Sequence, residues 1–216
     1  MVGMKNSILF SLGFMFFLQV SAQNKRYVSS MEKNLKMMDT CKSAPSYQQT
    51  ANGFERIANA EKKEWLPSYY VSLCNVFMAT TMKGDKIDEY CDIAEKYANK
   101  ADSLSPNNSE IYALRALIYS SRISVNPMLR GAKFGGMSGE MSSKAKELDP
   151  NNPRPYLLKA QGMYYTPPQF GGGKDKALPL LEETVKKYDA FHPASTIHPD
   201  WGKERAKMLL EECKKK

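Results

Sequence analysis

Few residues in this sequence have the types and spacing that metal binding requires. The two histidines, His192 and His198, each precede a proline, which forces an extended backbone and predicts a loop. With Asp189 and Asp200 nearby, they could in principle contribute to a metal site. However, no spacing fixes these side chains on one face, so we expect packed or solvated histidines and no metal site.

The sequence also lacks the arrangements that activate a nucleophile or a water molecule. It contains no Gly-x-Ser-x-Gly elbow, no His-Glu-x-x-His pair and no Cys–His setting. The paired carboxylates Glu182-Glu183 and Glu211-Glu212 are typical of solvated helix faces. The glycine-rich run that ends at Lys174 follows no strand and lacks the Lys-[Ser/Thr] ending of a phosphate-binding loop. We therefore expect no enzyme, no catalytic residue and no bound cofactor.

Four cysteines occur, at positions 41, 74, 91 and 213, and none shows metal-ligand spacing. Free cysteine behaves as a small buried apolar residue, and we favour that interpretation. Disulfides remain open, with Cys74 and Cys91 as the pair to test.

Two segments rich in proline, glycine and basic residues are the best candidates for a binding site. They span residues 121–136 and 164–174, and both end in Phe-Gly-Gly, which we expect to interrupt the helices and precede a new helix start. No acidic residue lies between Glu110 and Glu140, or between Asp149 and Asp175. If the two segments are neighbours in space, they form a basic, aromatic edge.

Arginine on such an edge would supply forked hydrogen bonds to an anionic partner, and aromatic rings would supply contact area. Alternatively, the aromatic rings only pack the segments onto the helices, and the cations are solvated. The predicted binding residues are Arg122, Arg130, Lys133, Phe134, Arg154, Leu157, Gln161, Tyr164, Tyr165 and Phe170.

Helical patterns dominate the elements that must position these residues, and strand signals are nearly absent. Apolar residues at 87, 91, 94, 98 and 101 share one helical face. Two segments end alike, in Ala-x-x-Leu-[Ser/Asp]-Pro-Asn-Asn, with Pro106 and Pro150 placed 44 residues apart. This spacing predicts a repeat of helical hairpins.

The repeats resemble the tetratricopeptide (TPR) family, whose helices carry large and small residues at fixed offsets. Tyr112, Ala116 and Tyr119 fit the first helix of one repeat, and Tyr156, Ala160 and Met163 fit the next. The resemblance implies an all-α, right-handed solenoid of about four hairpins, at about 25–62, 66–104, 107–148 and 152–188, with a capping helix at about 200–214. The long connections and the missing closing proline of the last repeat depart from the family. A non-repeating helical bundle is the alternative.

The N-terminus predicts export. Lys5 precedes an apolar stretch at 8–20 and small residues that end at Ala22, as in a signal peptide over 1–22. We expect residues 23–216 to form one periplasmic or secreted domain without a membrane span. Removing Lys5 lowers the formal charge from +8 to +7, which favours acidic partners but is too small to indicate nucleic-acid binding.

These observations predict a scaffold that binds an acidic protein or peptide through its concave face and the basic edge. The alternative is a small-molecule carrier, or accessory solute-binding component, with an aromatic cleft near Tyr164 and Tyr165. A Phe-Gly-Gly loop between TPR helices also resembles the periplasmic TPR components of solute-uptake systems and the TPR family called regulators of microtubule dynamics. A closed pocket would favour the carrier, whereas an open groove would favour the scaffold.

Overall fold

The computed structural model describes residues 25–215, so the expected signal peptide lies outside the described residues. Within that range every regular element is helical and no strand occurs, which confirms the all-α prediction. No helix among these residues combines the length and the apolar character needed to cross a bilayer.

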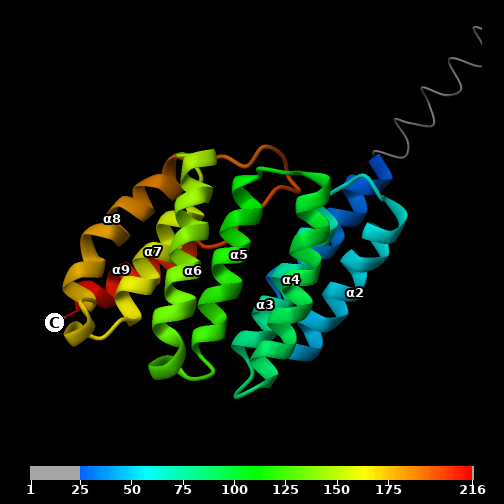
Figure 1. Cartoon of the computed structure of the whole chain (residues 1–216). Helices are drawn as coiled ribbons and strands as arrows, with labels where there is room; N and C mark the ends of the chain where they lie inside the picture. The colour runs from blue at the N-terminus through cyan, green and yellow to red at the C-terminus, as the bar shows by residue number, and fades with distance from the viewer. Residues whose placement is uncertain (1–24, 216) are drawn as a thin grey trace, which may run out of the picture.

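The helices run alternately up and down, so that consecutive helices pack antiparallel (Figure 1). Residues 25–39 form the N-terminal helix. It is followed by α2 (Ala44–Ala60), α3 (Leu66–Thr80), α4 (Lys86–Leu104), α5 (Ser109–Ile123), α6 (Pro127–Leu148), α7 (Arg154–Tyr165), the short 3-10 helix η1 (Pro168–Phe170), α8 (Lys174–Ala190) and α9 (Lys203–Lys214). Contacts also join α3 to α5, α5 to α7 and α7 to α9.

The main core surrounds α3, because nearly every side chain of that helix is buried. One face of α4 packs against it, and the buried residues of α4 are Ile87, Cys91, Ala94, Ala98 and Ala101. These are the five positions that the helical pattern predicts. A second core joins α7, α8 and α9, and a small cluster around Ala116 and Leu158 connects α5, α6 and α7.

Helix α6 differs from the prediction. It runs unbroken from Pro127 to Leu148, so the first Phe-Gly-Gly, at Phe134, lies inside a helix and not before one. Pro127 occupies the first turn, where its missing N–H costs nothing, and the Asn126 side chain accepts from the Leu129 amide at 3.2 Å. A glycine costs a helix only about 1 kcal/mol, and packing against α5 offsets this cost.

The connection at 166–173 is not helical apart from η1, as its proline and glycine content predicts. Gly171 and Gly173 have φ angles of 87° and 107°, a region that favours glycine. The α5–α6 and α7–α8 connections lie at the same end of the molecule (Figure 1).

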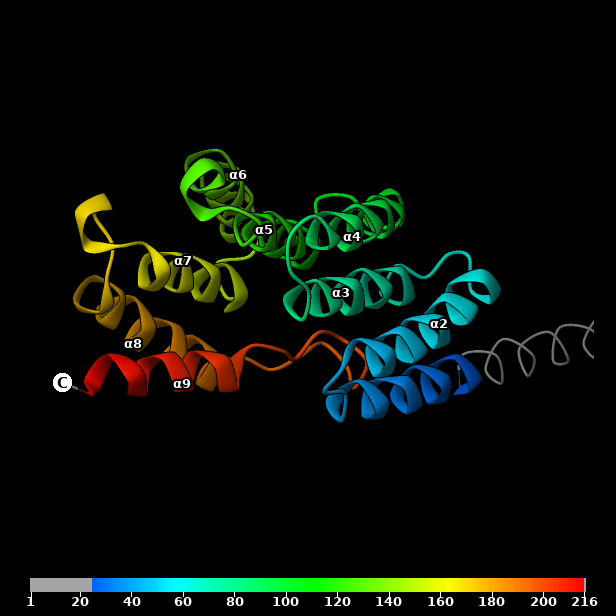
Figure 2. The same cartoon turned by 90° about the horizontal axis from the view of Figure 1, so that it is seen from below.

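The segment between α8 and α9, residues 191–202, crosses the molecule to the N-terminal helices and returns (Figure 2). We call it the strap. Ile197 of the strap is buried in the core around α3, and the Tyr70 hydroxyl donates to its carbonyl at 3.0 Å. Thr196 donates to Glu32 of the N-terminal helix at 2.8 Å. The sequence predicts a loop here from its two His-Pro pairs, but not the path of that loop across the molecule.

Candidate functional site

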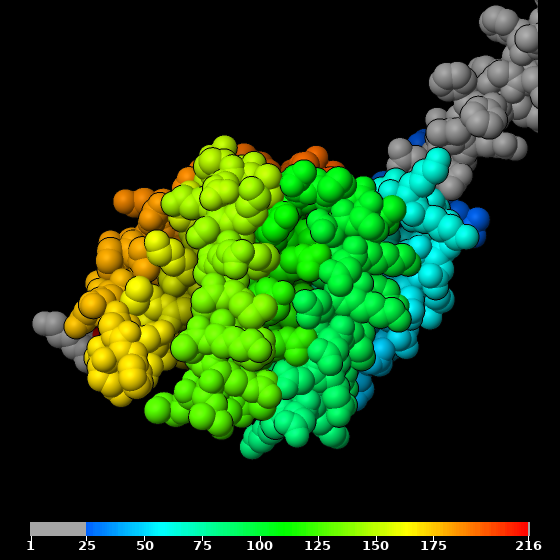
Figure 3. Space-filling model, viewed as in Figure 1, coloured from blue at the N-terminus to red at the C-terminus, as the bar shows by residue number. Residues whose placement is uncertain are grey.

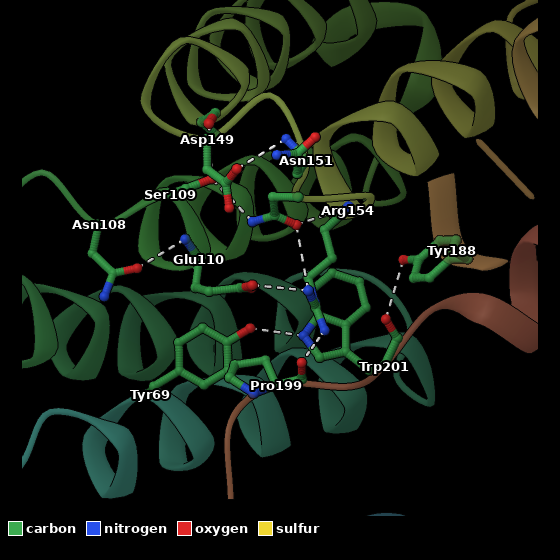
Figure 4. Close-up of polar contacts among 12 residues, drawn as sticks. Tyr69, Asn108, Ser109, Glu110, Asp149, Asn151, Arg154, Tyr188, Pro199 and Trp201 are labelled. Carbon is green, nitrogen blue, oxygen red and sulfur yellow. Dashed lines mark hydrogen bonds and ion pairs between the residues drawn. The ribbon is translucent and has the colours of Figure 1, made fainter. Parts of the chain in front are cut away.

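A buried arginine holds the strap against the helices (Figure 4). Arg154, in the first turn of α7, is fully buried, and its guanidinium donates to Glu110 of α5 at 2.8 Å and to the Pro199 carbonyl of the strap. The rings of Phe191 and Trp201 lie 5.0 and 5.4 Å from the guanidinium carbon. One side chain therefore ties α5, α7 and the strap together.

Glu110 and Arg154 lie at equivalent positions of the two repeats, 44 residues apart. Asn108 accepts a hydrogen bond from the Glu110 amide at 2.9 Å, and Asn152 accepts one from the Arg154 amide at 3.0 Å. The repeated Pro-Asn-Asn thus places, near the start of both helices, an asparagine that accepts a hydrogen bond from the amide two residues further on. It also places an acid and a base where α5 and α7 meet.

Burial raises the pKa of Glu110 to about 7, although Arg154 and then the hydrogen bond from Asn152 act to lower it. Its second carboxylate oxygen and the Nε of Arg154 are buried without a partner. An unpaired buried polar atom costs free energy. Glu110 and Arg154 therefore hold the strap in place, and the pKa of the Glu110 carboxyl group lies near neutral pH.

The strap in turn sets the position of α9. The Trp201 ring nitrogen donates to the Tyr69 hydroxyl at 2.7 Å, and Tyr188 donates to the Trp201 carbonyl at 3.1 Å. Gly202 follows with a φ of 107°, and a Cβ there would collide with the Tyr188 hydroxyl. A glycine is thus required where α9 begins.

The helix that the strap positions faces the C-terminal end of α7, where two tyrosines meet it. Arg205 of α9 donates to the Tyr165 hydroxyl and lies over its ring, with the guanidinium carbon 5.7 Å from the ring centre. Its other terminal nitrogen lies 3.9 Å from the Met208 sulfur. Tyr165 and Met208 stay 58% and 41% exposed, so an aromatic ring, a thioether and a cation are presented together.

The neighbouring Tyr164 fixes the other half of this arrangement. Its ring lies 4.9 Å from that of Tyr165, edge to face, and its hydroxyl donates to Glu212 at 2.6 Å. That hydrogen bond, followed by partial desolvation, raises the pKa of Tyr164 to about 12. Lys174 donates to the Glu212 carbonyl at 3.0 Å. We call Tyr164, Tyr165, Arg205, Met208 and Glu212 the tyrosine–arginine cluster.

Among the predicted binding residues, the arginines near α6 do not present free charge. Arg122 is nearly buried and pairs with three acids of α4: Asp88 at 3.1 Å, Asp92 at 2.6 Å and Glu95 at 3.1 Å. Arg130 pairs with Asp88 at 2.7 Å. Acids from α4, more than 25 residues away in sequence, therefore neutralise the predicted basic edge in part at these two positions.

The other predicted residues of that edge remain near the surface. Lys133 is exposed, and its ammonium lies 5.3 Å from the centre of the Phe134 ring. Phe134 is half-buried and stacks with Tyr119 at 6.5 Å. Phe134 therefore packs α6 onto α5, which is the second of the two interpretations offered by the sequence.

Arg154 and Leu157, two of the predicted binding residues, are both buried under the strap and α9. Gln161 is half-buried, and Phe170 is largely exposed in the α7–α8 connection. Sequence reasoning identified Tyr164 and Tyr165 but missed Arg205 and Met208. No repeat signal marks α9, although Arg205 and Met208, three residues apart, share a face of that helix.

The cysteines are unpaired, and His198 packs within the strap. All four cysteines are free, and burial raises the pKa values of Cys74 and Cys91. His198 bonds Ser195 at 2.7 Å and meets the Trp65 ring edge to face, and burial lowers its pKa. No group of three or more His, Cys, Asp or Glu side chains in residues 25–215 could hold a metal ion.

Comparison with known proteins places this arrangement in context. No protein-family model and no curated protein matches the sequence. Among solved structures, the HusA haemophore from Porphyromonas gingivalis matches with a TM-score of 0.79 and 38% sequence identity, over 87% of this chain and 92% of that chain. The chain belongs to the family of HusA. Because the match covers most of both chains, the two proteins share most of their helical arrangement.

Proposed function

We propose that this protein is an exported carrier, not an enzyme, and that it binds haem or a related tetrapyrrole at the tyrosine–arginine cluster. The relationship to HusA carries the proposal, since a protein that shares 38% of its sequence with this one is a haemophore. It favours the small-molecule interpretation of the sequence over the protein scaffold.

The cluster has the groups that such a ligand needs. Haem is a flat, largely apolar ring with two carboxylates and an iron that accepts nitrogen, oxygen or sulfur ligands. Arg205 can pair with a carboxylate through a forked hydrogen bond, in exchange for its present contact with Tyr165. The Tyr165 phenol and the Met208 thioether are both exposed and belong to side-chain types that ligate haem iron. The Tyr165 ring and the Met208 methylenes would also cover part of the ligand.

The contacts of α3, α5, α7 and α9 support a TPR-like solenoid, and that arrangement is part of the proposal. In such a solenoid a peptide would occupy the concave face. Here the strap already contacts Tyr69 and Tyr70 of α3 and Arg154 of α7. A peptide would have to displace the chain's own segment, which weighs against the scaffold.

The proposal is tested by titrating the chain from residue 23 with haemin and measuring the Soret absorption band. We expect a saturable complex, and weaker binding for Arg205→Gln by about tenfold or more, because a charge-assisted hydrogen bond contributes roughly 1.5–3 kcal/mol. Arg56→Gln is the matched control, since Arg56 is exposed on α2, far from the cluster in sequence. Equal affinity for the two variants would exclude the cluster as the site.

Iron-free protoporphyrin separates the contribution of the ring from that of the metal. If the Tyr165 phenol binds iron, Tyr165→Phe should weaken haemin binding and shift its Soret band while leaving protoporphyrin binding nearly unchanged. If the substitution weakens the binding of haemin and of protoporphyrin equally, Tyr165 acts through packing. Absence of binding by either ligand to the wild-type chain would refute the proposed function.

A further inference from the structure

The end of the molecule that carries the α3–α4, α5–α6 and α7–α8 connections has an unusual surface, and we call it the turn end. It comprises residues 81–89, 124–133 and 166–177. In the space-filling view, the start of α6 and the α7–α8 connection project separately at this end (Figure 3). The three most exposed large apolar side chains of the described residues all belong to it: Met128 (78%), Leu129 (80%) and Phe170 (62%).

These side chains make no contribution to the cores described above. Met128 and Leu129 occupy the first turn of α6, immediately after the helix-starting proline, and Phe170 ends η1. Exposing three such side chains at one end is costly unless a partner covers them. Isolated exposed apolar residues need no explanation, but their concentration at neighbouring turns does.

Basic side chains surround the apolar tips. The turn end contains six basic and four acidic residues, and one of those acids, Asp88, is already paired with Arg122 and Arg130. Lys83, Lys86, Lys133 and Lys176 are exposed, and none of them forms an ion pair with a described residue. At the opposite end, the connections 61–65, 105–108 and 149–153 carry no net positive charge.

We propose that the turn end docks on the surface of a bilayer that contains anionic lipids. The tips of separate turns can enter the interface individually, whereas a protein partner would be expected to meet a continuous core of aromatic residues and arginine. Lysines with long apolar stems can reach the headgroups beside the inserted tips. The docking does not depend on haem, so it stands or falls separately from the proposed function.

Co-sedimentation with vesicles tests this inference on the chain from residue 23, because the apolar stretch at 8–20 would bind lipid by itself. We expect the protein to sediment with vesicles that contain about 30% phosphatidylglycerol, more weakly with pure phosphatidylcholine, and less at high salt. Met128→Ser with Leu129→Ser, and separately Phe170→Ser, should each lower the apparent partition coefficient by about tenfold.

Ile93→Ser is the matched control, since Ile93 is 42% exposed on α4 and lies outside the turn end. It should bind vesicles like the wild type. Circular dichroism of each variant verifies that the helices remain. Three results would overturn the inference: no sedimentation with anionic vesicles, equal binding to neutral vesicles, or equal losses in the turn-end and Ile93 variants. An acidic protein as the true partner would produce the first result.

Discussion

At the scale of single residues, the most consequential position is Arg154, and its environment shows where sequence reasoning stops. A basic residue in a repeat helix predicts a surface position, because buried arginine is rare unless it is paired. Its partner, Glu110, was visible in the sequence at the equivalent position of the previous repeat. Only the strap, which arrives from residues 191–202, converts that surface into an interior. A contact that depends on the path of a loop cannot be predicted from local pattern.

The raised pKa of Glu110 predicts a pH dependence of stability. The folded chain holds the Glu110 proton up to about pH 7, whereas the unfolded chain releases it near the ordinary value of 4.5. Because the unfolded state then binds fewer protons than the native state, stability falls as pH rises through this window, by on the order of 3 kcal/mol from this group. Glu110→Gln cannot titrate and should lose this component.

Urea unfolding of the wild type and of Glu110→Gln at several pH values between about 4.5 and 8 measures this component of the free energy of unfolding. The other titratable groups contribute alike to the two proteins. The free energy of unfolding of the wild type should decline relative to that of Glu110→Gln as pH increases. Parallel curves would mean that the ion pair with Arg154 keeps Glu110 charged throughout, with a pKa near its usual value.

At the scale of elements, the sequence predicts helices well because apolar periodicity and Pro-Asn-Asn starts are local signals. The spacing of the apolar residues alone was enough to predict the buried face of α4. Helix α6 was misjudged because Pro127 and the three glycines of the segment 121–136 suggested a break. Helix propensity is a weak preference, and contact with α5 over most of the length of α6 overrides it. The Ser138 hydroxyl, for example, donates to the Ala116 carbonyl at 2.9 Å.

That explanation predicts opposite results for two glycine substitutions. Gly136 is exposed within α6, and a Cβ there would meet no atom within 4 Å. Gly136→Ala should therefore stabilise the protein by about 0.5–1 kcal/mol. Gly202→Ala should destabilise it, because its φ of 107° and the nearby Tyr188 hydroxyl both exclude a side chain. Denaturant midpoints compare the two, and a loss of stability in Gly136→Ala would show that its face of α6 is not free.

At the scale of the whole molecule, the strap makes this chain differ from a linear repeat array. In such an array each repeat contacts only its neighbours, so the two ends unfold independently. Here Ile197, in the C-terminal part of the sequence, lies in the core around α3, and Thr196 bonds Glu32. The tyrosine–arginine cluster depends on this connection, because the strap sets where α9 begins. Periodicity alone could not reveal it, since the strap has none.

Ile197→Ala tests whether the two ends are coupled. Truncating a buried isoleucine costs roughly 2–5 kcal/mol, and the cavity would loosen the strap where it meets the N-terminal helices. We expect faster amide hydrogen exchange in the N-terminal helix (25–39) and in α9, while α5 keeps its protection. In a linear array the change would remain near residue 197 and α9.

The same variant should also bind haemin more weakly, although none of the cluster residues is substituted. The reason is that Arg205 and Met208 lie on α9, whose position the strap sets. If exchange increased only in the strap, the tyrosine–arginine cluster would be independent of the N-terminal half, and the two ends would not act as one unit.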